Sequence, residues 1–356
     1  MSPDERCMAL ALSLGRRGLG RVWPNPAVGC VIVQGDRIVG RGWTADGGRP
    51  HAETRALAQA GTNARNATAY VTLEPCAHHG QTPPCVDALI AAGLARVVVA
   101  TGDPDPRVAG QGIARLRAAG ITVETGCLEA QAQADHAGFL SRLTRNRPYL
   151  TLKLAVSLDG RIATRTGDSQ WITGPLARRA VHMLRARHDA VLIGAGTARA
   201  DDPLLTVRDL GITRQPVRVV VSELLDLPLD GALARSAREV PLWLCHGPSA
   251  KTAPWQALGA QCLPCDPFDM PTVLQTLASR GLTRVLCEGG GRLAAALTAG
   301  GLVDEMLVFS AGVMIGAEGF PGLGNMGLDD LAQAPRMKLA DVSAIGPDTV
   351  SRWIKV

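Results

Sequence analysis

The chain has few aromatic side chains, at 3% of its 356 residues, and very few lysines among its basic residues. Its net charge of +5 therefore depends mainly on arginines that are scattered along the sequence. Proteins that bind single-stranded nucleic acid stack the bases on aromatic side chains, and this composition offers no such surface. We therefore expect no nucleic-acid partner. A phosphorylated small molecule is a sufficient reason for a mildly basic chain.

Long apolar runs are also missing. Because no stretch of about 18 or more apolar residues occurs, we expect no membrane-spanning segment and no membrane partner. The N-terminal residues Met1–Arg6 lack the basic and then apolar order of a signal peptide. The nine cysteines are an odd number in a long chain without an export signal, which favours reduced thiols over disulfides. These absences predict a cytoplasmic protein.

The length of the chain favours two domains over one. Expected strands and helices alternate through both halves, which is typical of α/β layers. The polar segment Thr144–Pro148 indicates a short linker. We therefore place a first domain at residues 1–146 and a second at residues 147–356.

The secondary structure that we expect follows from apolar periodicity and from helix start and stop signals. In the first domain we expect helices at residues 3–17, 51–60, 85–92 and 111–119, and strands at residues 27–33, 37–43, 68–73, 96–100 and 121–124. In the second we expect helices at residues 176–187, 272–279 and 292–297, and strands at residues 149–157, 190–193, 217–222, 242–245, 284–287, 305–310, 336–342 and 349–354.

The most informative part of the sequence is the segment His51-Ala52-Glu53, which is followed by Pro75-Cys76 and then by Cys85. It supplies one imidazole, two thiols and a carboxylate in the order typical of zinc-dependent deaminases. His51, Cys76 and Cys85 would bind zinc and leave its fourth position for a water, whose pKa the metal lowers. Glu53 would move a proton from that water to the leaving nitrogen.

Eight residues separate the two cysteines, whereas the usual nucleobase-deaminase form has two. They include His78 and His79, for which we expect substrate contact or a loop role, because the zinc already has three protein ligands. Cys85 is expected to begin a helix, and Cys76 to lie near a helix start. The helix dipole at these positions favours the thiolate form that zinc needs.

Several segments of the second half have roles that the residues alone leave open. Glu288–Arg292 lies between an expected strand and helix, where its glycines suit either phosphate binding or a structural turn. Asp201–Arg208 fits a turn capped by Asp, and Lys153 lies in an apolar strand, where it needs a partner or an anionic ligand. Cys262 and Cys265 resemble half of a zinc site or a redox pair, but also fit a coincidental surface pair.

Taken together, these motifs resemble the RibD family, the bifunctional deaminase/reductases of bacterial riboflavin biosynthesis. The matching segments are residues 24–29, 51–53 and 74–85 in the first domain, and residues 153–161, 169–173, 194–197, 201–208 and 288–292 in the second. The resemblance implies a cytidine-deaminase-like N-terminal domain and a dihydrofolate-reductase-like C-terminal domain.

The resemblance also implies two consecutive reactions. The first domain would use Zn²⁺ to deaminate 2,5-diamino-6-(5-phosphoribosylamino)pyrimidin-4-one. The second would use NADPH to reduce the ribosyl group of 5-amino-6-(5-phosphoribosylamino)uracil to ribityl. The family further suggests a homo-oligomer, a dimer or larger.

Site residues are carried over from the family by position. Besides the zinc ligands and Glu53, Asn25 would help to hold the pyrimidine. The positions that look like NADP contacts are Ala155, Trp171, Thr197, Asp201 and Ser222, together with the phosphate-binding stretch Gly290, Gly291, Arg292, Leu293, Ala294, Ala295 and Ala296. The positions that look like substrate contacts are Lys153, Ser169, Arg185, Leu205, Arg208 and Glu288. Arg185 and Arg208 suit a phosphate, which a guanidinium binds with two hydrogen bonds.

The chain departs from the family pattern at two places. Trp43-Thr44 stands where the family usually has an aromatic residue and then His, and the missing imidazole would weaken binding of the substrate phosphate in the deaminase. Val221-Ser222 stands where many members have Asp-Ser. Two other functions stay open: a nucleic-acid deaminase with an accessory binding domain, and a second domain that binds its cofactor without catalysing a reaction.

Overall fold

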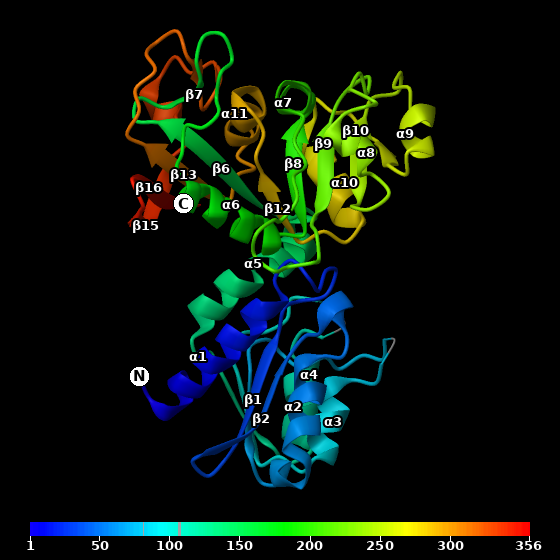
Figure 1. The fold of residues 1–356 in the computed structure, drawn as a ribbon. Helices are drawn as coiled ribbons and strands as arrows, with labels where there is room; N and C mark the ends of the chain where they lie inside the picture. Colours follow the sequence, from blue (N-terminus) through cyan, green and yellow to red (C-terminus); the bar gives the residue numbers. More distant parts are fainter. Residues whose placement is uncertain (81, 106–107) are drawn as a thin grey trace. The chain divides into compact units, whose positions relative to one another are not determined.

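The computed structural model describes residues 1–80, 82–105 and 108–356 (Figure 1). Gln81, which belongs to the segment between the two motif cysteines, lies outside the described residues. The chain divides into two compact units, Met1–Asn146 and Arg147–Val356. Within the described residues, no helix combines the length and the apolar character that crossing a membrane requires.

The first unit contains a five-stranded sheet of order β2-β1-β3-β4-β5. β1 is antiparallel to both β2 and β3, whereas β3, β4 and β5 are parallel. The strands are β1 (Gly29–Gln34), β2 (Arg37–Trp43), β3 (Thr68–Val71), β4 (Arg96–Val99) and β5 (Thr122–Thr125). The helices are α1 (Pro3–Gly15), α2 (Ala52–Ala60), α3 (Cys85–Ala91), α4 (Gln111–Ala118) and α5 (Glu129–Arg145), with short 3-10 turns at Arg16–Gly18, Asp46–Gly48 and Gly61–Ala64.

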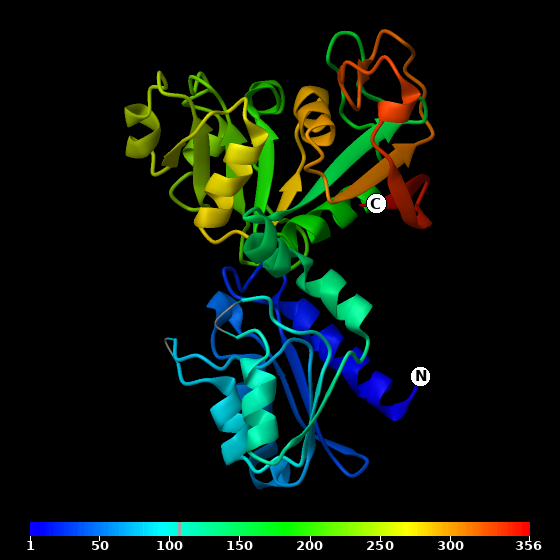
Figure 2. The ribbon, with the colours of Figure 1, turned by 180° about the vertical axis from the view of Figure 1, so that it is seen from behind.

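Helices cover both faces of this sheet (Figure 1, Figure 2). The helices α2, α3 and α4 pack on one face, and α1 and α5 pack on the other. Successive side chains of a strand point to opposite faces. On β1, Cys30 and Ile32 therefore belong to the core under α2, while Val31 belongs to the core under α1.

The second unit contains a nine-stranded sheet of order β11-β10-β9-β8-β12-β6-β13-β16-β15. Its strands from β11 to β13 in this order are parallel, and β16 is antiparallel to β13 and β15. The strands are β6 (Tyr149–Ser157), β8 (Ala190–Gly194), β9 (Val217–Val221), β10 (Leu242–His246), β11 (Gln261–Pro264), β12 (Arg284–Cys287), β13 (Glu305–Ala311), β15 (Met337–Ile345) and β16 (Asp348–Lys355).

A second small sheet pairs β7 (Arg161–Ala163) with β14 (Phe320–Pro321). The helices of this unit are α6 (Pro175–Ala186), α7 (Ala195–Asp201), α8 (Ala232–Arg235), α9 (Ala253–Ala257), α10 (Met270–Ser279) and α11 (Gly291–Ala299), with a 3-10 turn at Leu331–Gln333. All five residues of β9 are buried, as expected for a central parallel strand whose two faces are covered.

The expected linker at Thr144–Pro148 is partly wrong, because α5 continues to Arg145. This helix of 17 residues was not expected from the sequence. Its buried positions are Ala132, His136, Gly138 and Ser141, which are small or polar. A helix that buries such residues has no apolar periodicity to reveal it. The short elements α7, α8, α9, β7, β11 and β14 were missed as well.

Candidate active sites

Three side chains with metal-binding groups converge in the first unit. The ligand atoms of His51, Cys76 and Cys85 all lie within 4.8 Å of one another. Nδ1 of His51 lies 3.3 Å from Sγ of Cys85 and 3.6 Å from Sγ of Cys76. Across the described part of the chain, no other group of three or more metal-binding side chains has this proximity. One imidazole and two thiols fit a tetrahedral zinc ion that keeps one position open.

The ends of two helices place these groups. His51 is the N-cap of α2, so Glu53 lies in the first turn of that helix. Cys85 is the first residue of α3, and its backbone N–H donates a hydrogen bond of 3.3 Å to Sγ of Cys76. Cys76 begins no helix, because it lies in the loop after β3, but its sulfur reaches the start of α3. Both thiols therefore have a backbone or imidazole donor nearby.

Hydrogen bonds and burial set the charges of this cluster. Hydrogen bonds from the Cys85 thiol and from His51 lower the pKa of Cys76 to about 4. The hydrogen bond to Cys76, together with burial, raises the pKa of Cys85. Burial and then the charge of Cys76 raise the pKa of Glu53, whose side chain is 4% exposed. A buried carboxyl with a raised pKa is suited to accept and release a proton near neutral pH.

Glu74 supports the loop that carries Cys76, a role that the sequence analysis did not assign. Oε1 of Glu74 accepts hydrogen bonds from the backbone N–H groups of Gly112 and Ile113, at 3.0 and 3.2 Å, and Oε2 accepts one from Gly110 at 3.1 Å. These N–H groups belong to the start of α4, whose N-cap Gly110 has no side chain. The available signal was a carboxylate in an apolar segment, since a buried charge needs partners.

Thr44 and Asn25 lie beside the segment that leads to His51. The Thr44 hydroxyl donates to the carbonyl oxygen of Pro26 and accepts from the N–H of Val28, both at 3.0 Å. Thr44 is buried, so its hydroxyl holds the backbone that follows Asn25. The Asn25 amide donates to the carbonyl oxygen of Gly48 at 3.4 Å.

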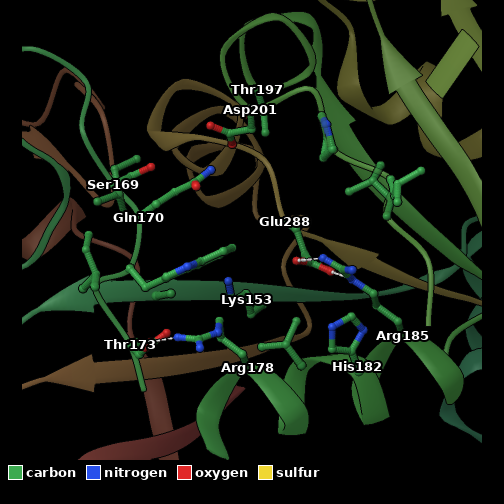
Figure 3. A pocket seen from close by; sticks show the side chains of 18 of the residues that line it. Lys153, Ser169, Gln170, Thr173, Arg178, His182, Arg185, Thr197, Asp201 and Glu288 are labelled. Atoms are coloured by element: carbon green, nitrogen blue, oxygen red, sulfur yellow. Dashed lines mark hydrogen bonds and ion pairs between the residues drawn. The ribbon is translucent and has the colours of Figure 1, made fainter. Parts of the chain in front are cut away.

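The second unit contains a cavity of about 800 Å³ beside β6 and at the carboxyl ends of β8 and β12 (Figure 3). This end of the strands is where open α/β sheets bind their ligands. Many of the residues that the resemblance assigned to cofactor or substrate line this one space. They are Lys153, Ala155, Ser169, Trp171, Arg185, Thr197, Asp201, Leu205, Arg208, Glu288 and Gly290.

The lining of this cavity brings the basic side chains of Arg185 and Lys153 close to the carboxylate of Glu288. The Arg185 guanidinium binds the Glu288 carboxylate through two hydrogen bonds of 2.6 and 2.9 Å. Burial opposes ionisation of Glu288, but Arg185 and Lys153 outweigh it, and the pKa of Glu288 is lowered. Burial also lowers the pKa of Lys153, although Glu288 and Asp201 act against this. In Figure 3 the Lys153 amine points into the space between Glu288 and Gln170.

The chain is similar to known proteins along nearly its whole length. Residues 1–101 match the family model "Cytidine and deoxycytidylate deaminase zinc-binding region", and residues 148–351 match "RibD C-terminal domain". The chain is 42% identical to the riboflavin biosynthesis protein RibD of Escherichia coli, over 97% of each chain.

The chain belongs to the RibD family.

Solved structures agree with this assignment. Acinetobacter baumannii RibD is 40% identical over 99% of both chains, with a TM-score of 0.91. The deaminase/reductase of Thermotoga maritima is 34% identical over 99% of both chains, with a TM-score of 0.88. The chain is thus a riboflavin-biosynthesis enzyme with a zinc-binding deaminase domain and a reductase domain that uses a nicotinamide cofactor, and the expected fold class is confirmed.

Other RibD-type cofactor positions lie outside the cavity lining. The hydroxyl of Ser222 accepts the N–H of Leu225 at 3.2 Å and closes the turn after β9. Ala294 and Ala295 on α11 are buried, whereas Gly291 begins this helix. A Cβ on Gly291 would lie only 2.5 Å from the carbonyl oxygen of Pro321, so this close approach requires glycine. The structure does not bring the positions after Gly290, Arg292 and Leu293 included, to the cavity with the other predicted residues.

A basic face of α6, which was not expected from the sequence, also borders the cavity. Arg178 and His182 line the cavity together with Arg185, one turn of the helix apart (Figure 3). Arg178 donates to the carbonyl oxygen of Thr173 at 2.7 Å, and its guanidinium lies 4.7 Å from the ring of Trp171. The spacing of these three basic residues places them on one side of a helix, and could have revealed them.

The thiols of Cys262 and Cys265 do not form half of a metal site among the described residues. Cys262 lies on β11, whereas Cys265 follows this strand and is hydrogen-bonded to Cys245. This hydrogen bond lowers the pKa of Cys265.

Proposed function

We propose that residues 1–146 catalyse the zinc-dependent hydrolytic deamination of 2,5-diamino-6-(5-phosphoribosylamino)pyrimidin-4-one. Residues 147–356 then reduce the ribosyl group of the deaminated product to ribityl with NADPH. The convergence of His51, Cys76 and Cys85 next to the buried carboxyl of Glu53 supports the first reaction. The second is supported by the cavity that gathers Lys153 and the assigned cofactor and substrate positions.

In the deaminase, His51, Cys76 and Cys85 would hold the zinc ion. Bound there, zinc would supply a water acidic enough to lose its proton near neutral pH. Glu53 receives that proton and delivers it to the departing amino nitrogen, which leaves as ammonia. Burial raises the pKa of the Glu53 carboxyl, which makes it a better proton acceptor. Asn25 orients the pyrimidine from the neighbouring loop.

In the reductase, the cofactor would supply the hydride, and the protein positions the reacting carbon. Ala155, Trp171, Thr197 and Asp201 line the side assigned to the cofactor. Ser169, Leu205 and Glu288 line the side assigned to the substrate. The guanidinium groups of Arg185 and Arg208 suit the substrate phosphate.

Mass spectrometry of the products tests both halves in one experiment. Zinc-loaded enzyme alone should convert the diamino substrate to the deaminated ribosyl product. Addition of NADPH should give the ribityl product, and NADH should replace NADPH poorly. Deamination without reduction would return the second domain to a cofactor-binding role. Deamination of RNA or single-stranded DNA instead would favour the nucleic-acid deaminase.

Glu53→Gln isolates the proton transfer. The variant keeps the size of the side chain and all three zinc donors, but it cannot accept a proton. We expect ammonia release to fall by about 10²- to 10⁴-fold while bound zinc is retained. Reduction of supplied deaminated substrate is the internal control and should not change. Unchanged ammonia release would refute the deaminase assignment.

We further propose that the enzyme is a cytoplasmic homo-oligomer, a dimer or larger. The edge strand β15 exposes nearly its whole length, including Leu339 and Val342. An exposed and partly apolar edge strand is a ready surface for pairing with another chain. Sedimentation of the purified protein should give at least twice the mass of one chain. The mass of a single chain would contradict this proposal.

A further inference from the structure

The proposed deaminase substrate carries a phosphate group, and the residues that would bind it are not among those assigned so far. Thr44 does not fill this role, because its buried hydroxyl is occupied by the backbone of Pro26 and Val28. A phosphate needs a cation or several N–H and O–H donors close to the reacting ring. A guanidinium close to the zinc ligands and not paired with a carboxylate would meet this need.

Arg49 lies two residues before His51, and its side chain turns towards the loop between the two zinc-binding cysteines. Nη1 of Arg49 donates a hydrogen bond to the hydroxyl of Thr82. A Cβ built on Gly80 would lie 3.3 Å from Nη2 of Arg49 and 4.0 Å from Nε2 of His78. The guanidinium, the imidazole and the hydroxyl therefore meet around a glycine that has no side chain to fill the space.

Two other arginines of this domain are held by other parts of the fold. Arg115 is paired with Asp87 on α3, and Arg55 donates to the carbonyl oxygen of Trp43 and stacks on its ring. Arg49 donates to the Thr82 hydroxyl in the loop between the cysteines, and no ion pair joins it to a carboxylate of residues 1–80, 82–105 and 108–356. It is close enough to the zinc ligands to act electrostatically on His51.

We propose that Arg49, assisted by the hydroxyl of Thr82 and by His78, binds the phosphate of the deaminase substrate. This inference rests on the proposed deamination reaction. A guanidinium can donate two parallel hydrogen bonds to a phosphate, which fixes the distance between the phosphate and the ring at the zinc site. Arg49 thus acts in substrate binding and positioning, while Glu53 performs the proton transfer.

The test compares the normal substrate with the same compound after enzymatic removal of its phosphate, using ammonia release as the measurement. For Arg49→Ala, KM of the phosphorylated substrate should rise about 10- to 100-fold, the effect of losing charge-assisted hydrogen bonds. KM of the dephosphorylated compound should be equal in the variant and the unchanged enzyme. Arg49→Lys keeps the charge without the paired donors and should give an intermediate KM.

Two controls separate this role from a structural one. Arg37→Ala removes an exposed arginine at the β1–β2 turn and should leave both KM values unchanged. Bound zinc and reductase turnover should be the same in all variants. Inorganic phosphate should compete with the phosphorylated substrate in the unchanged enzyme and less effectively in Arg49→Ala.

An equal rise of KM for both compounds would mean that Arg49 only holds the loop around Gly80, and would overturn the phosphate assignment. Unchanged KM values would do the same. If the unchanged enzyme releases no ammonia from either compound, the proposed deaminase function itself fails, and the inference fails with it.

Discussion

At the residue scale, two buried carboxyl groups near the zinc ligands have different surroundings and therefore different chemistry. Glu53 and Glu74 are both 4% exposed. Glu53 lies among thiols, and burial raises its pKa, so it is suited to proton transfer. Glu74 accepts hydrogen bonds from the N–H groups at the start of α4, and these bonds tie the loop of Cys76 to that helix. The same side chain is thus the proposed proton carrier at one position and supports a loop at the other.

Replacing Glu74 by Gln tests this support. The substitution removes the charge and turns one acceptor oxygen into an NH₂ group that faces backbone N–H groups. We expect the first domain to lose about 2–4 kcal/mol of unfolding free energy and zinc affinity to fall about 10-fold or more. Denaturant unfolding and competition with a metal chelator measure the two effects. Glu129→Gln on the exposed start of α5 is the matched control. Wild-type zinc affinity in Glu74→Gln would show that the cap does not position Cys76.

At the element scale, the distance between β2 and α2 decides where His51 and Glu53 lie. A Cβ on Gly42 would be 2.0 Å from the carbonyl oxygen of Ala52, and a Cβ on Gly40 would be 2.2 Å from that of Ala56. The helix therefore rests on the backbone of the strand with no side chain between them. Its N-terminal end, which carries a zinc ligand and the proposed proton carrier, is placed by this contact.

Gly42→Ala should push α2 away from the sheet. The added methyl group meets backbone atoms, which cannot move aside as a flexible side chain can, so we expect a loss of about 1–3 kcal/mol in stability. Ammonia release and bound zinc should decrease together. Gly312→Ala adds the same methyl group where no atom lies within 4 Å, and should change neither. Normal zinc content in Gly42→Ala would mean that α2 is positioned by other contacts.

The elements that the sequence predicted are those with local signals. The segments at β2, β6 and β12 were expected with the bounds that the structure has. Apolar side chains mark β6 and β12, and the Gly35-Asp36 turn marks the start of β2. The helix α5 was missed because it buries alanine, glycine and polar side chains. The helix α7 was missed because it begins in a glycine-rich motif, and glycine is a poor helix former.

At the scale of the whole molecule, the two units have separate cores and separate candidate sites. All zinc-site residues lie between Asn25 and Cys85, whereas the cavity of the second unit is lined by residues from Lys153 to Gly290. Among the described residues, no side chain belongs to both the zinc site and the cavity. The two activities should therefore be separable by treatments that affect one site.

Removal of the metal provides such a treatment. Dialysis against a zinc chelator should abolish ammonia release, because without zinc no metal lowers the pKa of the attacking water. Reduction of supplied 5-amino-6-(5-phosphoribosylamino)uracil should continue at its original rate. Zn²⁺ added back should restore deamination. Loss of the reductase activity together with the metal would show that the state of the first domain controls the second.

The sequence by itself determined most helices and strands and predicts His51, Cys76, Cys85 and Glu53 as the zinc and proton-transfer residues, because motif order, helix signals and apolar periodicity are local properties of the chain. Through a family resemblance it also predicts cofactor and substrate positions in the second domain, and many of these line one cavity. Only the tertiary structure decided that Glu74 caps α4, that Arg178 and His182 face the cavity, that backbone contacts occupy the Thr44 hydroxyl and that Arg49 pairs with no carboxylate of the described residues. These properties depend on which distant segments pack together, and hydrogen-bond partners and burial arise only from that packing.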